Sequence, residues 1–323
     1  MLPRRVIFAA NATTSSGAGH VMRLIEISKA FPPSIEKCFI GSVKLPWVKE
    51  LLDETFPFQN SEVGEMFGKH ELVVVDSYDD AFCRLVANCS RDSTIVQIAD
   101  RYTTLLPKSL IVFMDLPFDY KSENINRRIV AHGIRFIPAR KLIPSGTKFQ
   151  PIAKKVLVTT GGSVDKRIFS QLVSEVVKDE YRAIDFHFIG TLDNSVQKSL
   201  NIHFHEFGSG FDSIARDCDT AISAAGTSMW GLLSNNRLLG LATIVENQKA
   251  NYSYAISSKH ALPVFDFDNM KLDVGVLRTL LFDETSRRNI YRAISGQYDT
   301  LGASRVCELL LKLYDDNFNR NEH

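Results

Sequence analysis

The sequence lacks the features that mark several other classes of protein. Its five cysteines are odd in number and form no Cys-x-x-Cys pair, a usage typical of reduced, mostly buried thiols in a cytosolic protein. The formal net charge is +1 and no block of lysines or arginines forms a basic arm, so we expect no nucleic-acid partner. Neither a signal-peptide core nor an apolar run of bilayer length is found. We therefore expect a soluble, cytoplasmic chain without stable membrane insertion.

Length and composition indicate two globular domains. A chain of 323 residues is too long for one small core and fits two domains of ordinary size. Apolar residues make up 45% of it, both signs of charge are well mixed, and no segment is of low complexity. For the oligomeric state we expect a monomer or a weak dimer.

Apolar, β-branched runs alternate with helical patterns along the whole chain. The continuous run Val73-Val74-Val75 is typical of a strand covered on both faces, as in a parallel sheet flanked by helices. Residues 139–153, rich in turn formers, are the natural interdomain linker. We predict an α/β fold of GT-B type, with two Rossmann-like, doubly wound domains (residues 1–142 and 143–323) that face a central cleft. The expected strands lie at residues 6–10, 38–41, 72–76, 95–98, 110–114, 155–159, 184–189, 220–223, 239–245 and 263–267.

The most informative motif is Gly-Ala-Gly-His-Val-Met-Arg at residues 17–23, directly after the first expected strand. Glycine lets the loop backbone approach a ligand closely, and the start of the following helix suits an anion such as a diphosphate. Histidine titrates near neutral pH, which makes His20 a candidate general base. Arg23 lies one turn further on the same helix face, where it either binds a phosphate or carboxylate or holds Asp76 across the sheet.

Two further turns of small residues lie in the second half, each after an expected strand and before a helix. They are Gly161-Gly162-Ser163 and the run Ala-Ala-Gly-Thr-Ser at residues 224–228. Such residues expose backbone N–H groups to a diphosphate, and the hydroxyls of Thr227 and Ser228 add donors. Two turns of this kind in one half predict that it binds the nucleotide.

Taken in order, these blocks resemble the UDP-sugar hydrolases of pseudaminic acid biosynthesis, which share the GT-B fold with the glycosyltransferase that makes lipid II. The motif at residues 17–23 is similar to their Gly-x-Gly-His-x-x-Arg signature. The likeness continues at residues 74–78, 160–163, 221–230, 246–248 and 301–306, so it covers nearly the whole chain in the expected order.

The resemblance implies a reaction and a set of site residues. The reaction is hydrolysis at the anomeric carbon of a UDP-linked, acetamido-deoxy sugar, with inversion and without a metal or other cofactor. His20 would be the general base that activates water, and Asp76 the second catalytic residue, while the second domain stabilises the departing diphosphate. The implied substrate-binding residues are Gly17, Gly19, Arg23, Tyr78, Gly161, Gly162, Ser163, Ala225, Gly226, Thr227, Ser228, Glu246, Asn247 and Gln248.

The chain departs from those hydrolases at two positions. They carry an acidic residue after the tryptophan of the block at 221–230, where it holds the ribose hydroxyls, whereas this chain has Gly231. Where they have Asp-Asp, this chain has Ala99-Asp100. The first departure leaves the identity of the nucleotide open.

Two other functions remain open at this point. A glycosyltransferase would use the same donor site with a sugar or lipid hydroxyl in place of water, and a non-catalytic protein would only bind the nucleotide sugar. A metal site is not predicted. His203 and His205 alternate onto one strand face, but no further ligand stands at a convincing spacing, which favours surface histidines.

Overall fold

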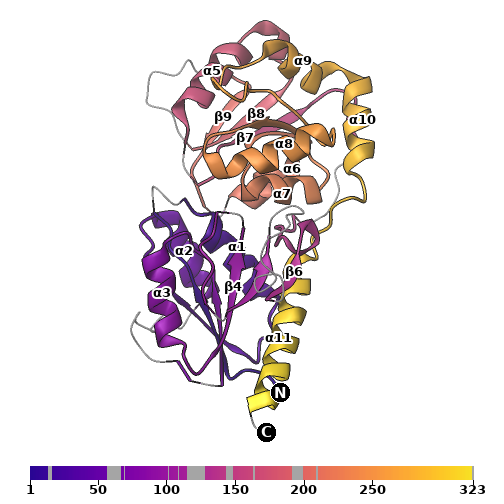
Figure 1. Ribbon diagram of the computed structural model, residues 1–323. Helices are drawn as coiled ribbons and strands as arrows, with labels where there is room; N and C mark the ends of the chain where they lie inside the picture. The colour runs from indigo at the N-terminus through magenta and orange to yellow at the C-terminus, as the bar shows by residue number, and fades with distance from the viewer. Residues whose placement is uncertain are drawn as a thin grey trace. The chain divides into compact units, whose positions relative to one another are not determined.

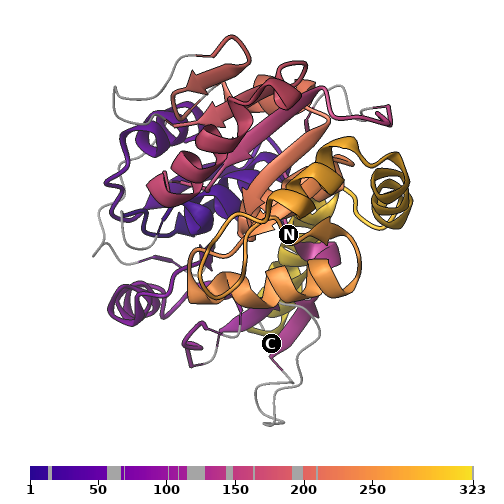
Figure 2. The same ribbon diagram turned by 90° about the horizontal axis from the view of Figure 1, so that it is seen from above.

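This computed structural model describes residues 1–13, 17–56, 67–68, 70–100, 102–107, 109–114, 128–142, 148–162, 164–190, 199–208 and 210–321. The chain divides into two compact units. Unit 1 comprises Met1–Pro138 and Leu301–His323, and unit 2 comprises Ala139–Thr300. Within the described residues each unit holds one six-stranded parallel sheet with helices beside it, which can be followed in two views (Figure 1 and Figure 2).

The sheet of unit 1 has the strand order β2-β1-β3-β4-β5-β6, and every neighbouring pair is parallel. Its strands are β1 (Arg5–Ala9), β2 (Glu36–Ile40), β3 (Glu71–Val75), β4 (Thr94–Ala99), β5 (Leu110–Phe113) and β6 (Ile129–His132). Its helices are α1 (Gly19–Ala30), α2 (Pro46–Thr55), α3 (Asp80–Cys89) and the C-terminal α11 (Gly302–Asn321).

The order of this sheet reverses between β1 and β3. The chain moves from β1 to β2 on one side and then returns to β3 on the other. Because crossovers between parallel strands are right-handed, the step from β1 to β2 and the oppositely directed step from β3 to β4 place α1 on one face and α3 on the other. Phe8 of β1 accordingly packs against Phe31 and Phe56 at the ends of α1 and α2, while Ile7 belongs to a cluster with Phe82 of α3. Ligands of open α/β sheets bind at the carboxyl ends of strands at such a reversal.

Unit 2 repeats this plan with the order β12-β11-β10-β7-β8-β9, which reverses between β7 and β10. Its strands are β7 (Lys155–Thr159), β8 (Asp185–Ile189), β9 (Ile202–His205), β10 (Thr220–Ala224), β11 (Leu238–Ala242) and β12 (Ala261–Leu262). Its helices are α5 (Lys166–Val176), α6 (Phe211–Asp217), α7 (Thr227–Ser234), α8 (Lys249–Ser257), α9 (Val274–Phe282) and α10 (Glu284–Ile294). All five residues of β10 are buried, and most of them are small.

The structure differs from the sequence-based expectation in the placement of α11. We expected residues 301–323 in the second domain, but they belong to unit 1, where α11 packs along α1. Gly302 at its start has no room for a side chain, because a Cβ there would lie 2.0 Å from the carbonyl oxygen of Ile137. The apolar stripe of a terminal helix shows that it packs on something, but not on which sheet.

Three strands also differ from expectation. Strands β6 and β9 were not among the expected strands, and the strand expected at residues 263–267 is replaced by the short β12, Ala261–Leu262, that precedes it. All five cysteines are buried and free, as predicted. None of the described helices has the length and apolar character that a membrane crossing requires.

Candidate active site

The loop after β1 depends on one of the glycines that the sequence singled out. Gly17 has a φ of +69°, which favours glycine, although a Cβ at this position would meet no atom within 4 Å. Its N–H donates to the carbonyl oxygen of Thr13 over 2.8 Å. Gly19 is the first residue of α1, and His20 follows it. The turn therefore favours glycine at position 17, and it sets His20 at the start of the helix.

Asp76 lies beside His20 because of the sheet topology. It follows β3 directly, and its N–H donates to the carbonyl oxygen of Ala9, the last residue of β1, over 2.9 Å. Since β1 and β3 are parallel neighbours, their carboxyl ends meet at the same edge of the sheet. Both side chains are buried there, with 5% of His20 and 1% of Asp76 exposed.

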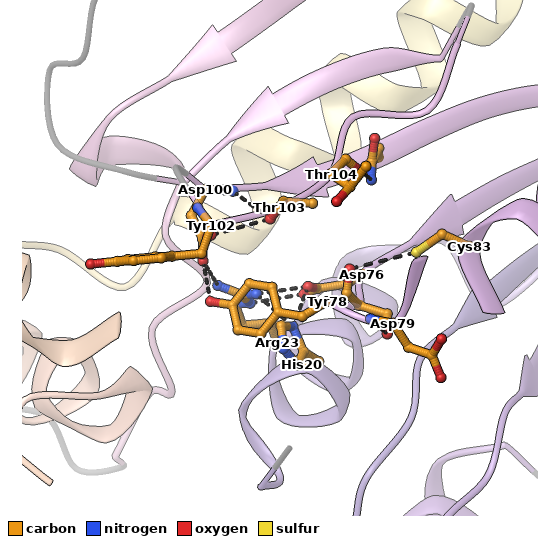
Figure 3. Close-up of polar contacts among 12 residues, drawn as sticks. His20, Arg23, Asp76, Tyr78, Asp79, Cys83, Asp100, Tyr102, Thr103 and Thr104 are labelled. Carbon is orange, nitrogen blue, oxygen red and sulfur yellow. Dashed lines mark hydrogen bonds and ion pairs between the residues drawn. The ribbon is translucent and has the colours of Figure 1, made fainter. Parts of the chain in front are cut away.

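The His20 ring is held by a short hydrogen bond to Asp76. Nδ1 of His20 and Oδ1 of Asp76 are 2.6 Å apart. Such a separation from a carboxylate oxygen needs a proton between the two atoms, so Nδ1 donates, and when the ring is neutral Nε2 keeps its lone pair. In the described part of the chain Nε2 has no hydrogen-bond partner. Figure 3 shows the pair with the surrounding polar side chains.

Arg23 contacts both oxygens of the same carboxylate, and its Nη2 lies 2.9 Å from Nδ1 of His20. Its Nε donates to Oδ2 of Asp76 over 2.8 Å and its Nη2 to Oδ1 over 2.7 Å, a two-point contact that fixes the plane of the carboxylate. Its Nη1 lies 4.0 Å from Oδ2 of Asp100. Of the two roles weighed for Arg23, the contact with Asp76 is present. Its contact with substrate stays a prediction.

Tyr78 and Asp100 complete the cluster. The rings of Tyr78 and His20 meet edge to face with their centroids 4.4 Å apart, and the Tyr78 hydroxyl donates to Oδ2 of Asp100 over 2.5 Å (Figure 3). Asp100 also accepts from the hydroxyl of Thr103 over 3.1 Å. Asp100 was not among the predicted site residues. The available signal was a carboxylate directly after β4, the neighbour of β3 in the sheet.

The buried charges of Asp76 and Arg23 compensate each other. Burial by itself raises the pKa of Asp76, but the charge of Arg23 and the hydrogen bonds from Arg23 and His20 outweigh this and lower it. For Arg23, burial lowers the pKa, and the carboxylates of Asp76 and Asp100 more than reverse this. Asp76 and Arg23 are therefore ionised at neutral pH. A neutral imidazole with one nitrogen fixed by a carboxylate and the other open can accept a proton from a bound hydroxyl or water.

The two predicted turns of unit 2 lie at the reversal of its own sheet. Gly161, after β7, has a φ of +95°, and Gly226, after β10, directly precedes α7. Gln248 lies beside Gly226, since a Cβ on that glycine would be 3.5 Å from Nε2 of Gln248. Because β7 and β10 are parallel neighbours, both turns share one edge of the sheet. Ser163 lies outside the described residues.

The remaining predicted positions belong to the same part of unit 2. Thr227 and Ser228 open α7, and no side chain caps this helix. Glu246 and Asn247 begin a turn of 3-10 helix, Glu246–Gln248, and Glu246 forms an ion pair of 2.7 Å with Lys249. Binding of a ligand by any of these residues stays a prediction.

Gly231 faces a neighbouring segment of backbone. A Cβ added to it would meet the backbone nitrogen of Arg140 at 3.6 Å, an ordinary contact. Asn235, one turn later, donates to the carbonyl oxygens of Gly231 and Arg140 over 2.6 and 2.8 Å. The segment around Arg140 therefore packs against this end of α7, yet leaves room for a Cβ atom at position 231.

The two histidines of β9 lie beside polar residues of β8, a proximity that the sequence did not indicate. His203 and His205 share a sheet face with His187 and Asp185 of β8, in register across the two strands. Ligand atoms of Asp185, His187 and His203 all lie within 4.8 Å of one another. The missing signal was the pairing of β8 with β9, because ligands on different strands have no fixed spacing in sequence.

Comparison with known proteins identifies the fold. No protein-family model matches the chain, and no curated protein is significantly similar to it in sequence. Solved structures do match over nearly the whole chain. The spinosyn forosaminyltransferase SpnP has a TM-score of 0.60 at 14% identity, with 97% of this chain and 100% of that chain covered. The chain has the GT-B fold.

Two further GT-B neighbours were solved with ligands. The UDP-GlcNAc 2-epimerase from Neisseria meningitidis, bound to UDP-GlcNAc, has a TM-score of 0.57 at 10% identity over 95% of this chain and 100% of that chain. The glycosyltransferase SsfS6 from Streptomyces sp. SF2575, complexed with thymidine diphosphate, has a TM-score of 0.56 at 10% identity. The match covers 94% of this chain and 99% of that chain. The prediction of two Rossmann-like, doubly wound domains is thus confirmed. At these identities the likeness establishes the fold alone.

Proposed function

We propose that this protein hydrolyses a nucleotide-activated sugar, with water as the nucleophile and UDP as the leaving group. The observation that carries the proposal is the 2.6 Å hydrogen bond between His20 and Asp76, which leaves Nε2 of His20 open as a proton acceptor. This atom pair lies at the carboxyl edge of a sheet where its order reverses, the usual ligand edge of an α/β unit. The fold likeness to proteins holding UDP-GlcNAc and thymidine diphosphate supports the substrate class.

In the proposed reaction Nε2 of His20 removes a proton from water as the water oxygen attacks the anomeric carbon. The bond between that carbon and the diphosphate oxygen breaks, its electron pair leaves with UDP, and the configuration inverts. Asp76 keeps the ring in one tautomer and stabilises the positive charge that forms on it, while Arg23 keeps Asp76 ionised. The proton then passes to solvent. A base of this kind contributes about 10²–10⁴-fold to the rate.

Unit 2 would hold the diphosphate. Backbone N–H groups at the turns after β7 and β10, the start of α7 and the hydroxyls of Thr227 and Ser228 would stabilise the charge that develops on the leaving group. Gln248, beside Gly226, would face the sugar. In the described residues no group of three metal-ligating side chains lies at His20 or at these turns. We therefore expect turnover to persist in excess EDTA.

Glycosyl transfer is the second candidate, because the fold likeness includes glycosyltransferases. The chemistry at His20 would be the same, with the proton taken from an acceptor hydroxyl instead of water. The two candidates differ in one requirement: transfer needs an acceptor, whereas hydrolysis releases UDP in water alone.

The test is UDP release from a panel of UDP-linked acetamido-deoxy sugars in ¹⁸O-labelled water without an acceptor. Hydrolysis at the anomeric carbon predicts unlabelled UDP and one ¹⁸O in the free sugar, whose first-formed anomer, seen by NMR, is inverted. Label in UDP would mean attack at phosphorus and would contradict the proposal. UDP release that begins only when an acceptor is added would establish transfer instead.

A further inference from the structure

Unit 2 carries a cluster of four polar side chains on one face of β8 and β9. The two strands pair in parallel with His187 opposite His203, so Asp185 and His187 of β8 share a face with His203 and His205 of β9. The alternate residues of the two strands, such as Phe188, point to the other face, where Phe188 packs against Phe169 of α5. The cluster therefore covers the face opposite α5, and its four members are only half-buried.

The spacing of three of these side chains suits a metal ion. Each of Asp185, His187 and His203 offers one ligand atom, and these three atoms lie within 4.8 Å of one another. The distance from Nε2 of His203 to Oδ1 of Asp185 is 3.7 Å. Ligands bound tetrahedrally at about 2.0–2.1 Å are about 3.3 Å apart. Small rotations of surface side chains would close the difference. The strands thus arrange an Asp-x-His beside a His-x-His, with all ligands on one face.

The fourth side chain supplies an orienting contact. Nδ1 of His187 and Nε2 of His205 are 3.0 Å apart, within hydrogen-bond distance, and their rings are stacked. When Nδ1 of His187 donates to His205, Nε2 of His187 is the atom left to bind a metal. Metal-binding histidines usually have their second nitrogen held in this way, which fixes tautomer and ring orientation.

No other interaction in the described structure uses these ligand atoms. The side chains of Asp185 and His203 have only each other as polar partner, and the rings of His187 and His203 stack with their centroids 4.8 Å apart. Strand β9 is the last strand in the described order of its sheet, and β8 is its neighbouring strand there. A bond from both strands to one ion would tie this edge strand to its neighbour.

We propose that Asp185, His187 and His203 bind a divalent transition-metal ion, Zn²⁺ in particular, with His205 orienting His187 and water in the fourth position. Two imidazoles and one carboxylate are a donor set that zinc accepts, whereas Mg²⁺ and Ca²⁺ prefer oxygen ligands. The site is separate from the His20 cluster, which lies in unit 1. The proposal therefore does not depend on the hydrolase activity.

The test uses the full chain without a histidine tag, stripped with EDTA and dialysed, and titrated with Zn²⁺ by calorimetry. We expect one Zn²⁺ per chain, with affinity at least 10-fold lower in His203→Ala and about 10–100-fold lower in His205→Ala, the range for loss of an orienting partner. The matched control is His132→Ala, which removes an exposed histidine of β6 in unit 1 and should leave the affinity unchanged. His203→Gln repeats the test with a polar side chain if the alanine variant does not fold.

Cobalt gives a second readout. Co²⁺ bound by these ligands should show the strong visible absorption of a four-coordinate ion, and His187→Ala should abolish it. A Zn²⁺ affinity that is equal in wild type and His203→Ala would overturn the proposal, as would a wild-type Co²⁺ spectrum no different from that of the hydrated ion. Neither readout involves UDP release, so failure here leaves the proposed reaction untouched.

Discussion

Each unit of the protein contains a buried arginine–aspartate pair, and the two pairs differ in what completes them. In unit 2, Nη2 of Arg287 donates to Oδ1 of Asp219 over 2.9 Å, and its other nitrogens reach backbone carbonyls and the hydroxyl of Thr220. The second oxygen of Asp219 accepts from the N–H groups of Lys154 and Lys155. The protein itself satisfies every polar atom of this structural pair.

In unit 1 the Arg23–Asp76 pair has the same charges and a similar geometry, but its carboxylate also holds His20. That ring brings one nitrogen, Nε2, that has no partner in the described part of the chain. An ion pair whose remaining hydrogen bonds go to the backbone holds two structural elements together. An ion pair that also binds an imidazole holds a potential general base in place. A buried ion pair is therefore no sign of function by itself, and the open atom beside it is the informative feature.

The largest expected effect is on catalysis at the pair in unit 1. His20→Ala should lower kcat by about 10²–10⁴-fold, because it removes the proton acceptor and leaves Arg23 and Asp76 in place. Affinity for UDP should change little, since unit 2 would hold the diphosphate. The measurement is steady-state UDP release together with calorimetric UDP binding, with His132→Ala as control. Full activity in His20→Ala would remove this residue from the mechanism.

The next effect is on folding stability and concerns the structural pair. Arg287→Met should lower the free energy of unfolding by about 3–5 kcal/mol, because it leaves the buried carboxylate of Asp219 without its counter-charge. Arg23→Met should cost less, since Nδ1 of His20 still donates a hydrogen bond to Asp76. Urea unfolding of both variants measures the difference. Equal losses in the two would mean that the pair in unit 1 is as purely structural as the one in unit 2.

A smaller effect is expected on nucleotide affinity in unit 2. If the ribose lies at the start of α7, Gly231→Glu adds a charged acceptor worth roughly 1.5–3 kcal/mol, or about one to two powers of ten in affinity. Calorimetry should show the gain for UDP and not for deoxy-UDP. The melting temperature is no substitute, because replacing a helix glycine stabilises by about 0.5–1 kcal/mol without ligand. Unchanged, equal affinities for both nucleotides would mean that the ribose binds elsewhere.

The smallest effect is a pH dependence of stability. The pKa of Asp76 is lowered in the folded protein, chiefly by Arg23 once burial is overcome. Its contribution to stability is therefore present above its unfolded pKa of about 4 and is lost as the pH falls through its lower folded value. Urea unfolding between pH 6 and pH 3 should show a shallower decline in Asp76→Asn than in the wild type. Parallel curves for the two proteins would contradict the assigned charge of Asp76.

The sequence predicted the strands that form the centre of each sheet, because buried parallel strands are continuous apolar runs that can be recognised locally. It also placed His20 and the glycine turns at strand ends, and it gave holding Asp76 as one of two roles for Arg23. It missed strands β6 and β9, the unit to which α11 belongs and the part played by Asp100. Each of these features depends on which segments become neighbours in the fold. The apolar pattern of one segment does not show which other segment it packs against.

The sequence by itself determined the α/β class, the two Rossmann-like units and the loop that carries His20, since strand runs, turn glycines and helix starts are local properties. Only the tertiary structure decided that Nδ1 of His20 is bound by Asp76 while Nε2 stays open, because these residues meet through the pairing of β1 with β3. The same holds for Asp185, His187 and His203, which share one face only because β8 and β9 pair in register. The local sequence determines which side chains a strand places on each of its faces. The order of strands in the sheet determines which of those side chains become neighbours.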